Sequence, residues 1–275
     1  MSKTTLYHLS DLHFHSIPRH PRQWLSKRAL GALNLILNRR RFYPLDRARQ
    51  LVRLLADREW DHLVITGDIT QLSLEEEFDL AHRTLKPLLE RGADRITILP
   101  GNHDRYVKTP DGKNGFDAYF GEYFGGGEIA TRDLTGVWKL AGWDSTLPTP
   151  PFMAWGRVRA ATLRATEEWL AGLEKGSRVI LANHYPLYFK PPFQYVPSHE
   201  MRGIGAVRRW VANHPIELYL HGHLHINWVR KVTRHGHTCT HVNSASSTQK
   251  SSGRRSAFHR IELSGSEYEV FPERY

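Results

Sequence analysis

Five short apolar runs in this chain each lead directly into Asp, Asn or His side chains. The runs are residues 5–9, 62–65, 95–99, 178–182 and 216–220. Runs of this length with few charges are typical of buried strands. In α/β folds, ligands gather beyond the carboxyl ends of the strands, so the polar side chains that follow the runs are expected to meet at one edge of a sheet.

Amphipathic stretches between the apolar runs predict helices that cover the sheets. They span residues 46–59, 74–91, 160–173 and 202–212, whereas the last third of the chain reads as consecutive strands at 228–233, 238–242, 258–263 and 267–271. Alternation of strands and helices places helices outside the sheets. We therefore predict an α/β fold, a four-layer αββα sandwich of two mixed β-sheets flanked by helices. We expect one domain over residues 1–275, with a basic helical insertion at 15–45.

The polar residues after the runs form an ordered set of motifs. Each motif by itself is common, but their order and their position after strands are hard to obtain by chance. The chain has one cysteine, so a metal site here would use His, Asp, Glu or Asn ligands instead of a thiolate cluster. The motifs are Asp11-x-His13, Gly67-Asp68, Gly101-Asn102-His103-Asp104, His184 and Gly222-His223-x-His225.

This ordered set resembles that of the calcineurin-like metallophosphoesterases, and the resemblance runs from Leu6 to about Leu263. It implies a first metal bound by Asp11, His13 and His225 and a second bound by Asn102, His184 and His223, with Asp68 bridging both. It also implies catalytic roles for Asp68 and for His103, which would stand near the leaving group, while Asp104 would support the ligands.

The implied chemistry is phosphoester hydrolysis by a pair of divalent cations. Cations about 3.5–4 Å apart lower the pKa of a bound water, and the resulting hydroxide attacks phosphorus at neutral pH. The mixed nitrogen and oxygen ligands disfavour Mg²⁺ and suit Mn²⁺, Fe or Zn²⁺, and Mn²⁺ is the metal that we expect to support activity. Arg105 and Arg157 are further candidates for contact with a substrate phosphate.

The positive charge of the chain is concentrated in one segment. Residues 14–45 contain no Asp or Glu and carry seven of the ten net positive charges. Residues 22–42 are a candidate for binding an anionic membrane surface, because a basic helix with Trp and Leu on its other face is typical of a membrane interface. The alternative is an insertion whose apolar stripe packs on the body; this stripe is Leu25, Ala29, Leu33, Ile36 and Leu37. Aromatic residues are not interleaved as a nucleic-acid stacking platform requires, so nucleic acid is the least favoured partner.

The substrate stays open between two main alternatives. Residues 8–15, the insertion after them, residues 183–187 and residues 220–223 resemble a subgroup of UDP-2,3-diacylglucosamine pyrophosphatases of lipid A synthesis, although the commoner subgroup has Arg where His103 stands. That resemblance implies a nucleotide-lipid substrate. The other alternative is a cyclic-nucleotide or generic soluble phosphodiesterase, which needs no basic membrane helix.

The sequence also bears on where the protein works. From the residues at the N-terminus we expect no signal peptide, and no apolar run in the sequence reaches the length that crosses a bilayer. The single cysteine suits a reducing compartment. We therefore expect a cytoplasmic protein, peripheral on the inner face of the membrane if the insertion binds lipid.

Overall fold

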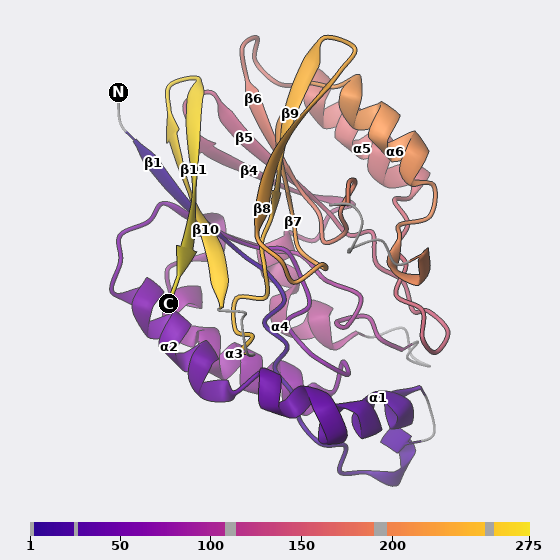
Figure 1. Ribbon diagram of the computed structural model, residues 1–275. Coiled ribbons are helices and arrows are strands. Elements are labelled where there is room, and N and C mark those ends of the chain that lie inside the picture. Colours follow the sequence, from indigo (N-terminus) through magenta and orange to yellow (C-terminus); the bar gives the residue numbers. More distant parts are fainter. Residues whose placement is uncertain (1–2, 25–26, 108–113, 190–196, 251–255) are drawn as a thin grey trace.

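Two β-sheets form the centre of the molecule in the computed structural model, which describes residues 3–24, 27–107, 114–189, 197–250 and 256–275 (Figure 1). The first sheet has the order β11-β10-β1-β2-β3, and the second has the order β4-β5-β6-β7-β9-β8. Both are mixed: β1, β2 and β3 are parallel, as are β5, β6, β7 and β9, whereas the other pairs are antiparallel. The strands of the first sheet are β1 (Thr4–Leu9), β2 (His62–Ile65), β3 (Ile96–Ile98), β10 (Ala257–Ser264) and β11 (Glu267–Arg274). Those of the second are β4 (Ile129–Thr135), β5 (Trp138–Trp143), β6 (Arg178–Ala182), β7 (Ile216–His221), β8 (Trp228–Arg234) and β9 (His237–Asn243).

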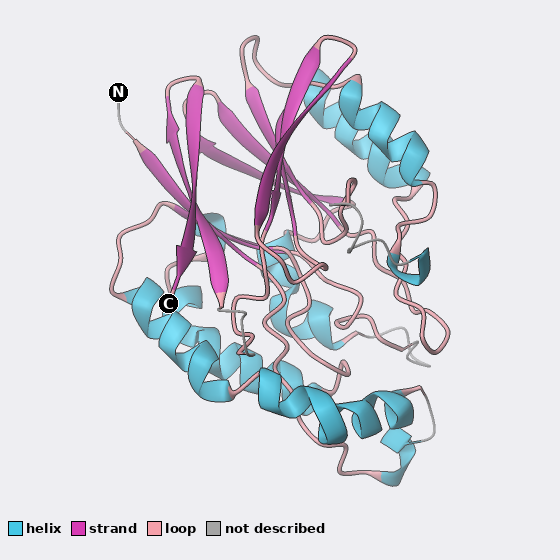
Figure 2. Ribbon diagram, in the orientation of Figure 1, coloured by secondary structure: helices cyan, strands magenta, loops and turns pink. Residues whose placement is uncertain are grey.

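Helices cover the outer face of each sheet (Figure 2). The first sheet is covered by α2 (Leu45–Ala56), α3 (Glu75–Leu89) and α4 (Gly115–Phe124), and the second by α5 (Ala160–Ala171) and α6 (Ile204–Ala212). Short 3-10 helices, η4 (Ala93–Arg95) and η5 (Pro197–His199), lie in connecting loops. The expected αββα sandwich is confirmed.

Alternation along the strands produces three layers of core. In β1, Tyr7 and Leu9 pack among the helices of the first sheet, whereas Leu6 points between the two sheets. The central layer joins β1 and β2 to β5, β6 and β7 through fully buried side chains such as Leu6, Val64 and Leu140. Each such side chain contributes roughly 1.5–3 kcal/mol on burial. These cores hold the strand ends, and therefore the loops that follow them, in fixed positions.

The structure contains elements that the sequence did not predict. The nine expected strands and four expected helices are present, but β4, β5 and α4 were missed. β4 is largely solvent-accessible and carries Arg132 and Asp133, so it has no apolar run that would reveal it. α4 has only a weakly amphipathic sequence that includes Gly115 and Gly121.

The basic insertion is not one continuous helix. It consists of η1 (Pro21–Trp24), α1 (Arg28–Asn34), the π-helical turn η2 (Leu35–Arg39) and η3 (Arg40–Phe42). Ala32 and Leu35 are its buried anchors and pack on Leu72 and Leu74.

Of the apolar stripe that was one alternative for packing on the body, Ala29 is half-buried, whereas three residues face solvent. Leu33, Ile36 and Leu37 are 54%, 44% and 64% exposed. Leu25 lies outside the described residues. The face that contacts the body is narrower, because it is built from Ala32 and Leu35 and from the hydrogen bonds of Arg28 to the carbonyls of the 72–73 loop. Among the described residues, no helix combines the length and the apolar character needed to cross a membrane.

Candidate metal centre

The predicted site residues meet where the two sheets face each other. Three loops of the first sheet contribute Asp11 and His13 after β1, Asp68 after β2 and Asn102 after β3. Two loops of the second sheet contribute His184 after β6 and both His223 and His225 after β7. The structure brings these seven side chains into two adjacent clusters that share Asp68.

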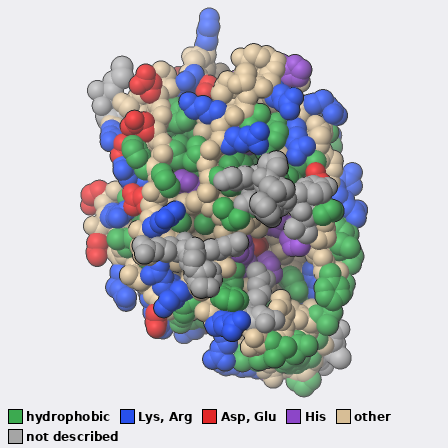
Figure 3. Space-filling model, viewed as in Figure 1, with side chains coloured by type: hydrophobic (Ala, Val, Ile, Leu, Met, Phe, Trp, Pro, Cys, Tyr) green, Lys and Arg blue, Asp and Glu red, His purple; other side chains and the backbone are tan. Residues whose placement is uncertain are grey.

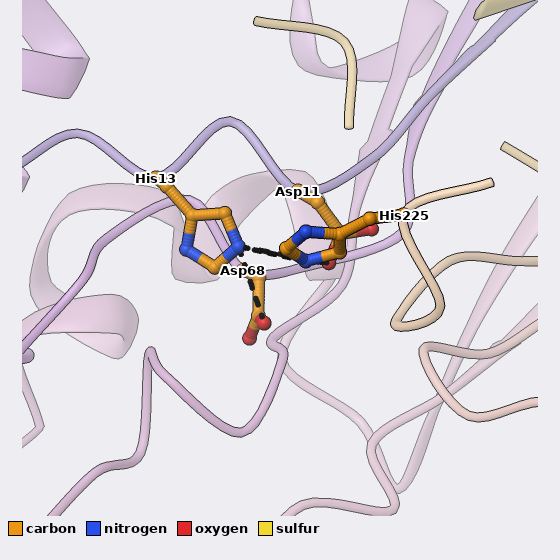
Figure 4. Close-up of side chains that lie close together, drawn as sticks. All are labelled: Asp11, His13, Asp68 and His225. Carbon is orange, nitrogen blue, oxygen red and sulfur yellow. Dashed lines mark hydrogen bonds and ion pairs between the residues drawn. The ribbon is translucent and has the colours of Figure 1, made fainter. Parts of the chain in front are cut away.

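The first cluster contains Asp11, His13, Asp68 and His225 (Figure 4). The Nε2 atoms of His13 and His225 lie 3.1 Å apart, and His225 Nε2 lies 3.1 Å from Asp11 Oδ1. Asp68 Oδ2 lies 3.8 Å from His13 Nε2. Burial raises the pKa of Asp11, but the neighbouring His225 outweighs it and holds the pKa below its usual value. The cluster therefore presents carboxylate oxygens and ring nitrogens to a common point.

The second cluster contains Asp68, Asn102, His184 and His223. His184 Nε2 lies 3.1 Å from His223 Nδ1, 3.2 Å from Asn102 Oδ1 and 3.5 Å from Asp68 Oδ1. Burial lowers the pKa of His184 and lowers that of His223 still further, so both imidazoles are neutral near pH 7.

Backbone carbonyls fix the ring protons of this second cluster. His184 Nδ1 lies 2.7 Å from the carbonyl of Thr66, and His223 Nε2 lies 3.1 Å from that of His199. A carbonyl only accepts, so these nitrogens carry the protons of the two neutral rings. The remaining nitrogens then face each other as two lone pairs 3.1 Å apart, with the Asn102 and Asp68 oxygens beside them. Such a gathering of acceptors repels itself unless a cation lies among them, so the donor set fits a divalent metal.

Comparisons with known proteins agree with this geometry. A family model described as calcineurin-like phosphoesterase matches residues 4–227. The chain belongs to the calcineurin-like phosphoesterases. It is therefore a metal-dependent phosphoesterase with a metal-binding site of Asp and His residues.

Solved structures share the fold at low sequence identity. A dimetal phosphatase from Danio rerio has a TM-score of 0.67 at 14% identity, with 99% of each chain covered. A purple acid phosphatase from seeds of yellow lupin (Lupinus luteus) has a TM-score of 0.62 at 14% identity, over 99% of this chain and 52% of that one. No curated protein matches the chain.

Backbone strain in this phosphoesterase is concentrated at the metal centre. Eight non-glycine residues in the described part of the chain have a positive φ, and five of them are the predicted ligands Asp11, His13, Asp68, His223 and His225, with φ between 50° and 71°. This conformation costs about 1–3 kcal/mol per residue and persists where the surrounding structure enforces it, which is a feature of functional sites. The loops are thus shaped by the position of the ligands rather than by local preference.

Two glycines of the motifs allow the loops to approach each other. A Cβ at Gly101 would lie 2.2 Å from both the amide nitrogen and Oδ1 of Asp68, and a Cβ at Gly222 would lie 1.8 Å from Ser10 Oγ and 2.4 Å from Asp11 Oδ2. No side chain fits at either position, so each motif contains glycine for a steric reason.

His103 borders both clusters. Its amide donates to Asp68 Oδ1 at 2.8 Å, and its ring lies edge-on to His13 with centroids 5.0 Å apart. The carbonyl of Gln71 lies 2.6 Å from His103 Nδ1, and the ring stacks on Tyr106 with centroids 5.6 Å apart. These contacts fix the orientation of the imidazole beside the metal ligands.

Asp104 connects two ligand-bearing loops. Its buried carboxylate accepts hydrogen bonds from the amides of Ile69, Thr70 and Gly101 and from the Thr70 hydroxyl. Burial raises the pKa of Asp104 to about 6 although these hydrogen bonds favour the carboxylate. Asp104 therefore supports the loops that carry Asp68 and Asn102.

The two predicted arginines lie in different surroundings. The guanidinium of Arg105 is paired with Asp117 at 2.8 Å and with Asp144 at 2.9 Å, and only 21% of its side chain is exposed. Arg157 is exposed, and its backbone amide donates to Ser145. Contact of either arginine with a phosphate stays a prediction.

Other residues support the site without a sequence signal of their own. Ser246 and Thr248 donate to the carbonyls of Asp11 and Leu12 and so hold the first ligand loop. Tyr43 lies with its hydroxyl 3.0 Å from His225 Nδ1. Tyr43 could not be found from the sequence because 182 positions separate it from His225.

Proposed function

We propose that this phosphoesterase hydrolyses a lipid-linked pyrophosphate, such as UDP-2,3-diacylglucosamine, at an anionic membrane surface. The observation that carries the proposal is the exposed apolar face of the insertion. Trp24, Leu30, Leu33, Ile36 and Leu37 are each at least 39% exposed. A soluble substrate gives no reason for so many exposed apolar side chains on one short segment.

The apolar face is bordered by positive charge and by a second exposed loop. Arg40 and Arg41 are exposed at the end of the insertion, and Phe152 and Met153 are 83% and 40% exposed. Lys27 joins the two segments by donating to the carbonyl of Thr149 at 2.9 Å. Hydrophobic side chains gather at the lower end of the face in Figure 3, where the insertion lies in Figure 1, and Lys and Arg side chains lie beside them. Apolar groups flanked by cations suit the interface of an anionic bilayer.

The insertion also lies close to the candidate metal centre. The Lys27 ammonium stands 4.0 Å from the centre of the Tyr106 ring, and Tyr106 stacks on His103. A lipid held on the insertion would therefore have its phosphate groups within a few side chains of the metal centre.

We assign the two clusters as sites for two divalent cations. Asp11, His13 and His225 would hold one, Asn102, His184 and His223 the other, and Asp68 would serve both. Such a pair supplies Lewis-acid activation of water and neutralises the charge that develops on phosphoryl oxygens. The mixed nitrogen and oxygen ligands suit Mn²⁺, Fe or Zn²⁺, and of these we propose Mn²⁺.

His103 is the group that we assign to proton transfer. The Gln71 carbonyl accepts at Nδ1, so the ring is held in one orientation and Nε2 is the nitrogen that exchanges a proton with the leaving oxygen. Asp104 is fully buried and holds the adjacent loops together.

The test compares hydrolysis of UDP-2,3-diacylglucosamine in detergent with hydrolysis of bis-p-nitrophenyl phosphate, both with Mn²⁺ and with a chelator control. We expect a strong preference for the lipid, and we expect Asp68→Ala to reduce both activities to background because it removes the shared ligand. Turnover of the chromogenic diester alone would replace the lipid proposal with a soluble diester. Unchanged turnover by Asp68→Ala would overturn the site assignment.

A further inference from the structure

The end of the insertion reaches the metal centre through one side chain. Tyr43 follows η3 and precedes Pro44, which caps the first turn of α2. It is only 4% exposed, its hydroxyl lies 3.0 Å from His225 Nδ1, and its ring packs on His13 with centroids 4.7 Å apart. Tyr43 therefore contacts two ligands of the first cluster.

His225 differs from His184 and His223 in the partner of its outer nitrogen, meaning the ring nitrogen that points away from the cluster of ligands. The outer nitrogens of His184 and His223 face backbone carbonyls, whereas that of His225 faces the phenol of Tyr43. An imidazole that binds metal needs a partner for its other N–H, and this partner fixes both the tautomer and the orientation of the ring. Tyr43 occupies this position for His225.

A phenol can serve His225 with or without a cation. When Nε2 faces a cation, Nδ1 carries the proton and donates to the Tyr43 oxygen. When Nε2 keeps the proton, the Tyr43 hydroxyl donates to Nδ1. A carbonyl lacks this second possibility. The hydrogen bond therefore holds the ring near its binding position in both states.

Tyr43 also borders a cavity beside the first ligand loop. This cavity has a volume of about 160 Å³, and its lining includes Phe14, Ala48 and Leu80.

We propose that Tyr43 is a positioning residue that orients His225 for cation binding and so connects the basic insertion to the first metal cluster. The proposal rests on the assignment of His225 as a ligand under the proposed function. It adds a role for the insertion inside the site, separate from any contact with lipid.

The test is Tyr43→Phe, which removes the hydroxyl and keeps the ring. We expect the affinity for one of two Mn²⁺ ions to fall about 10- to 100-fold while the affinity for the other stays the same, because partners of this kind contribute on that scale. Equilibrium dialysis gives the two affinities, and the electron paramagnetic resonance spectrum of bound Mn²⁺ reports the changed ligand geometry. The thermal unfolding midpoint of the metal-free protein should fall only slightly, because Tyr43→Phe removes one buried hydrogen bond and leaves the packing of the ring intact.

Tyr268→Phe is the matched control, because the Tyr268 hydroxyl bonds Thr240 instead of a predicted ligand. It should leave both Mn²⁺ affinities unchanged. Equal affinities in Tyr43→Phe and the parent would overturn the proposal, as would a parallel loss of both affinities together with a lower unfolding midpoint.

His225→Ala separates this proposal from the ligand assignment. If His225→Ala weakens one Mn²⁺ site and Tyr43→Phe does not, only the positioning role is wrong. If His225→Ala also leaves both affinities intact, the ligand assignment itself is wrong, and the Tyr43 proposal is overturned with it.

Discussion

At the scale of single residues, the metal centre depends on glycines that lack a side chain as much as on the side chains that bind metal. Gly101 precedes Asn102, and the space where its Cβ would stand is occupied by the backbone and carboxylate of Asp68. The residue that is proposed to bridge the cations and the residue that starts the Asn102 loop are thus in direct contact. Any side chain at position 101 separates them.

We expect Gly101→Ala to weaken Mn²⁺ binding at least tenfold and to destabilise the fold by about 1–3 kcal/mol, because the added methyl forces the two loops apart. Equilibrium dialysis and denaturant unfolding measure the two effects. Gly121→Ala is the matched control, since its Cβ has open space in α4, with the nearest neighbouring atom 4.0 Å away. There alanine should stabilise the helix by up to about 1 kcal/mol and leave hydrolysis unchanged. Normal metal binding by Gly101→Ala would contradict the steric argument.

At the scale of elements, the insertion has one face that packs on the body and one face that is exposed to solvent. Ala32 and Leu35 attach it to the body, while the opposite face, which includes Leu33 and Leu37, is left exposed. A segment of this length gains little stability from its own helical turns, so the attachment depends on these few buried contacts.

We expect the double variant Leu33→Ser/Leu37→Ser to bind anionic vesicles about tenfold more weakly and to keep its rate on bis-p-nitrophenyl phosphate. Binding weakens because the two leucine side chains no longer bury apolar surface in the membrane interface, where burial is partial. Vesicle sedimentation measures binding. Val137→Ser/Val229→Ser removes two other exposed apolar side chains, 38% and 44% exposed, and should bind vesicles like the parent. Equal binding by the leucine variant and the parent would exclude this face as the docking surface.

How far the sequence predicts the elements depends on whether their signal is local. The strands before Asp11, Asp68 and His184 are short apolar runs and could be predicted, as could the order of the ligand motifs. Which face of the insertion is buried could not be predicted, because Ala32 and Leu35 are buried by Leu72 and Leu74, which lie far along the chain. Tyr43, the partner of His225, could not be predicted for the same reason, because it lies far from His225 in the sequence.

At the scale of the whole molecule, the core contains an unusual number of neutral histidines. Burial lowers the pKa of His62 and of His241 to about 3 and that of His259 to about 4, and it lowers those of His8 and His221 well below the usual value. In the unfolded chain these groups titrate near pH 6.5. Below that pH the unfolded state binds protons that the folded state does not.

Stability of the metal-free protein should therefore fall as the pH drops from about 6.5 towards 4, by about 1.4 kcal/mol per pH unit for each histidine. Burial raises the pKa of Glu77 to about 8 and that of Asp104 to about 6, so these two carboxyls oppose the trend but are outnumbered. Denaturant unfolding at pH 7 and pH 5 in the presence of a chelator measures the difference. His259→Phe should make the decline shallower by about one histidine's share. Equal stability at the two pH values would contradict the prediction.

The two clusters straddle the boundary between the sheets, since His225 and Asp11 come from opposite sheets, as do His184 and Asp68. A sliding of one sheet over the other by a fraction of an ångström would hardly change how much apolar surface is buried, but it would alter the ligand distances at both clusters. The rate of hydrolysis is consequently a sensitive measure of how the two sheets are positioned relative to each other. In this enzyme, a small displacement of one sheet relative to the other should lower turnover before calorimetry detects a change in stability.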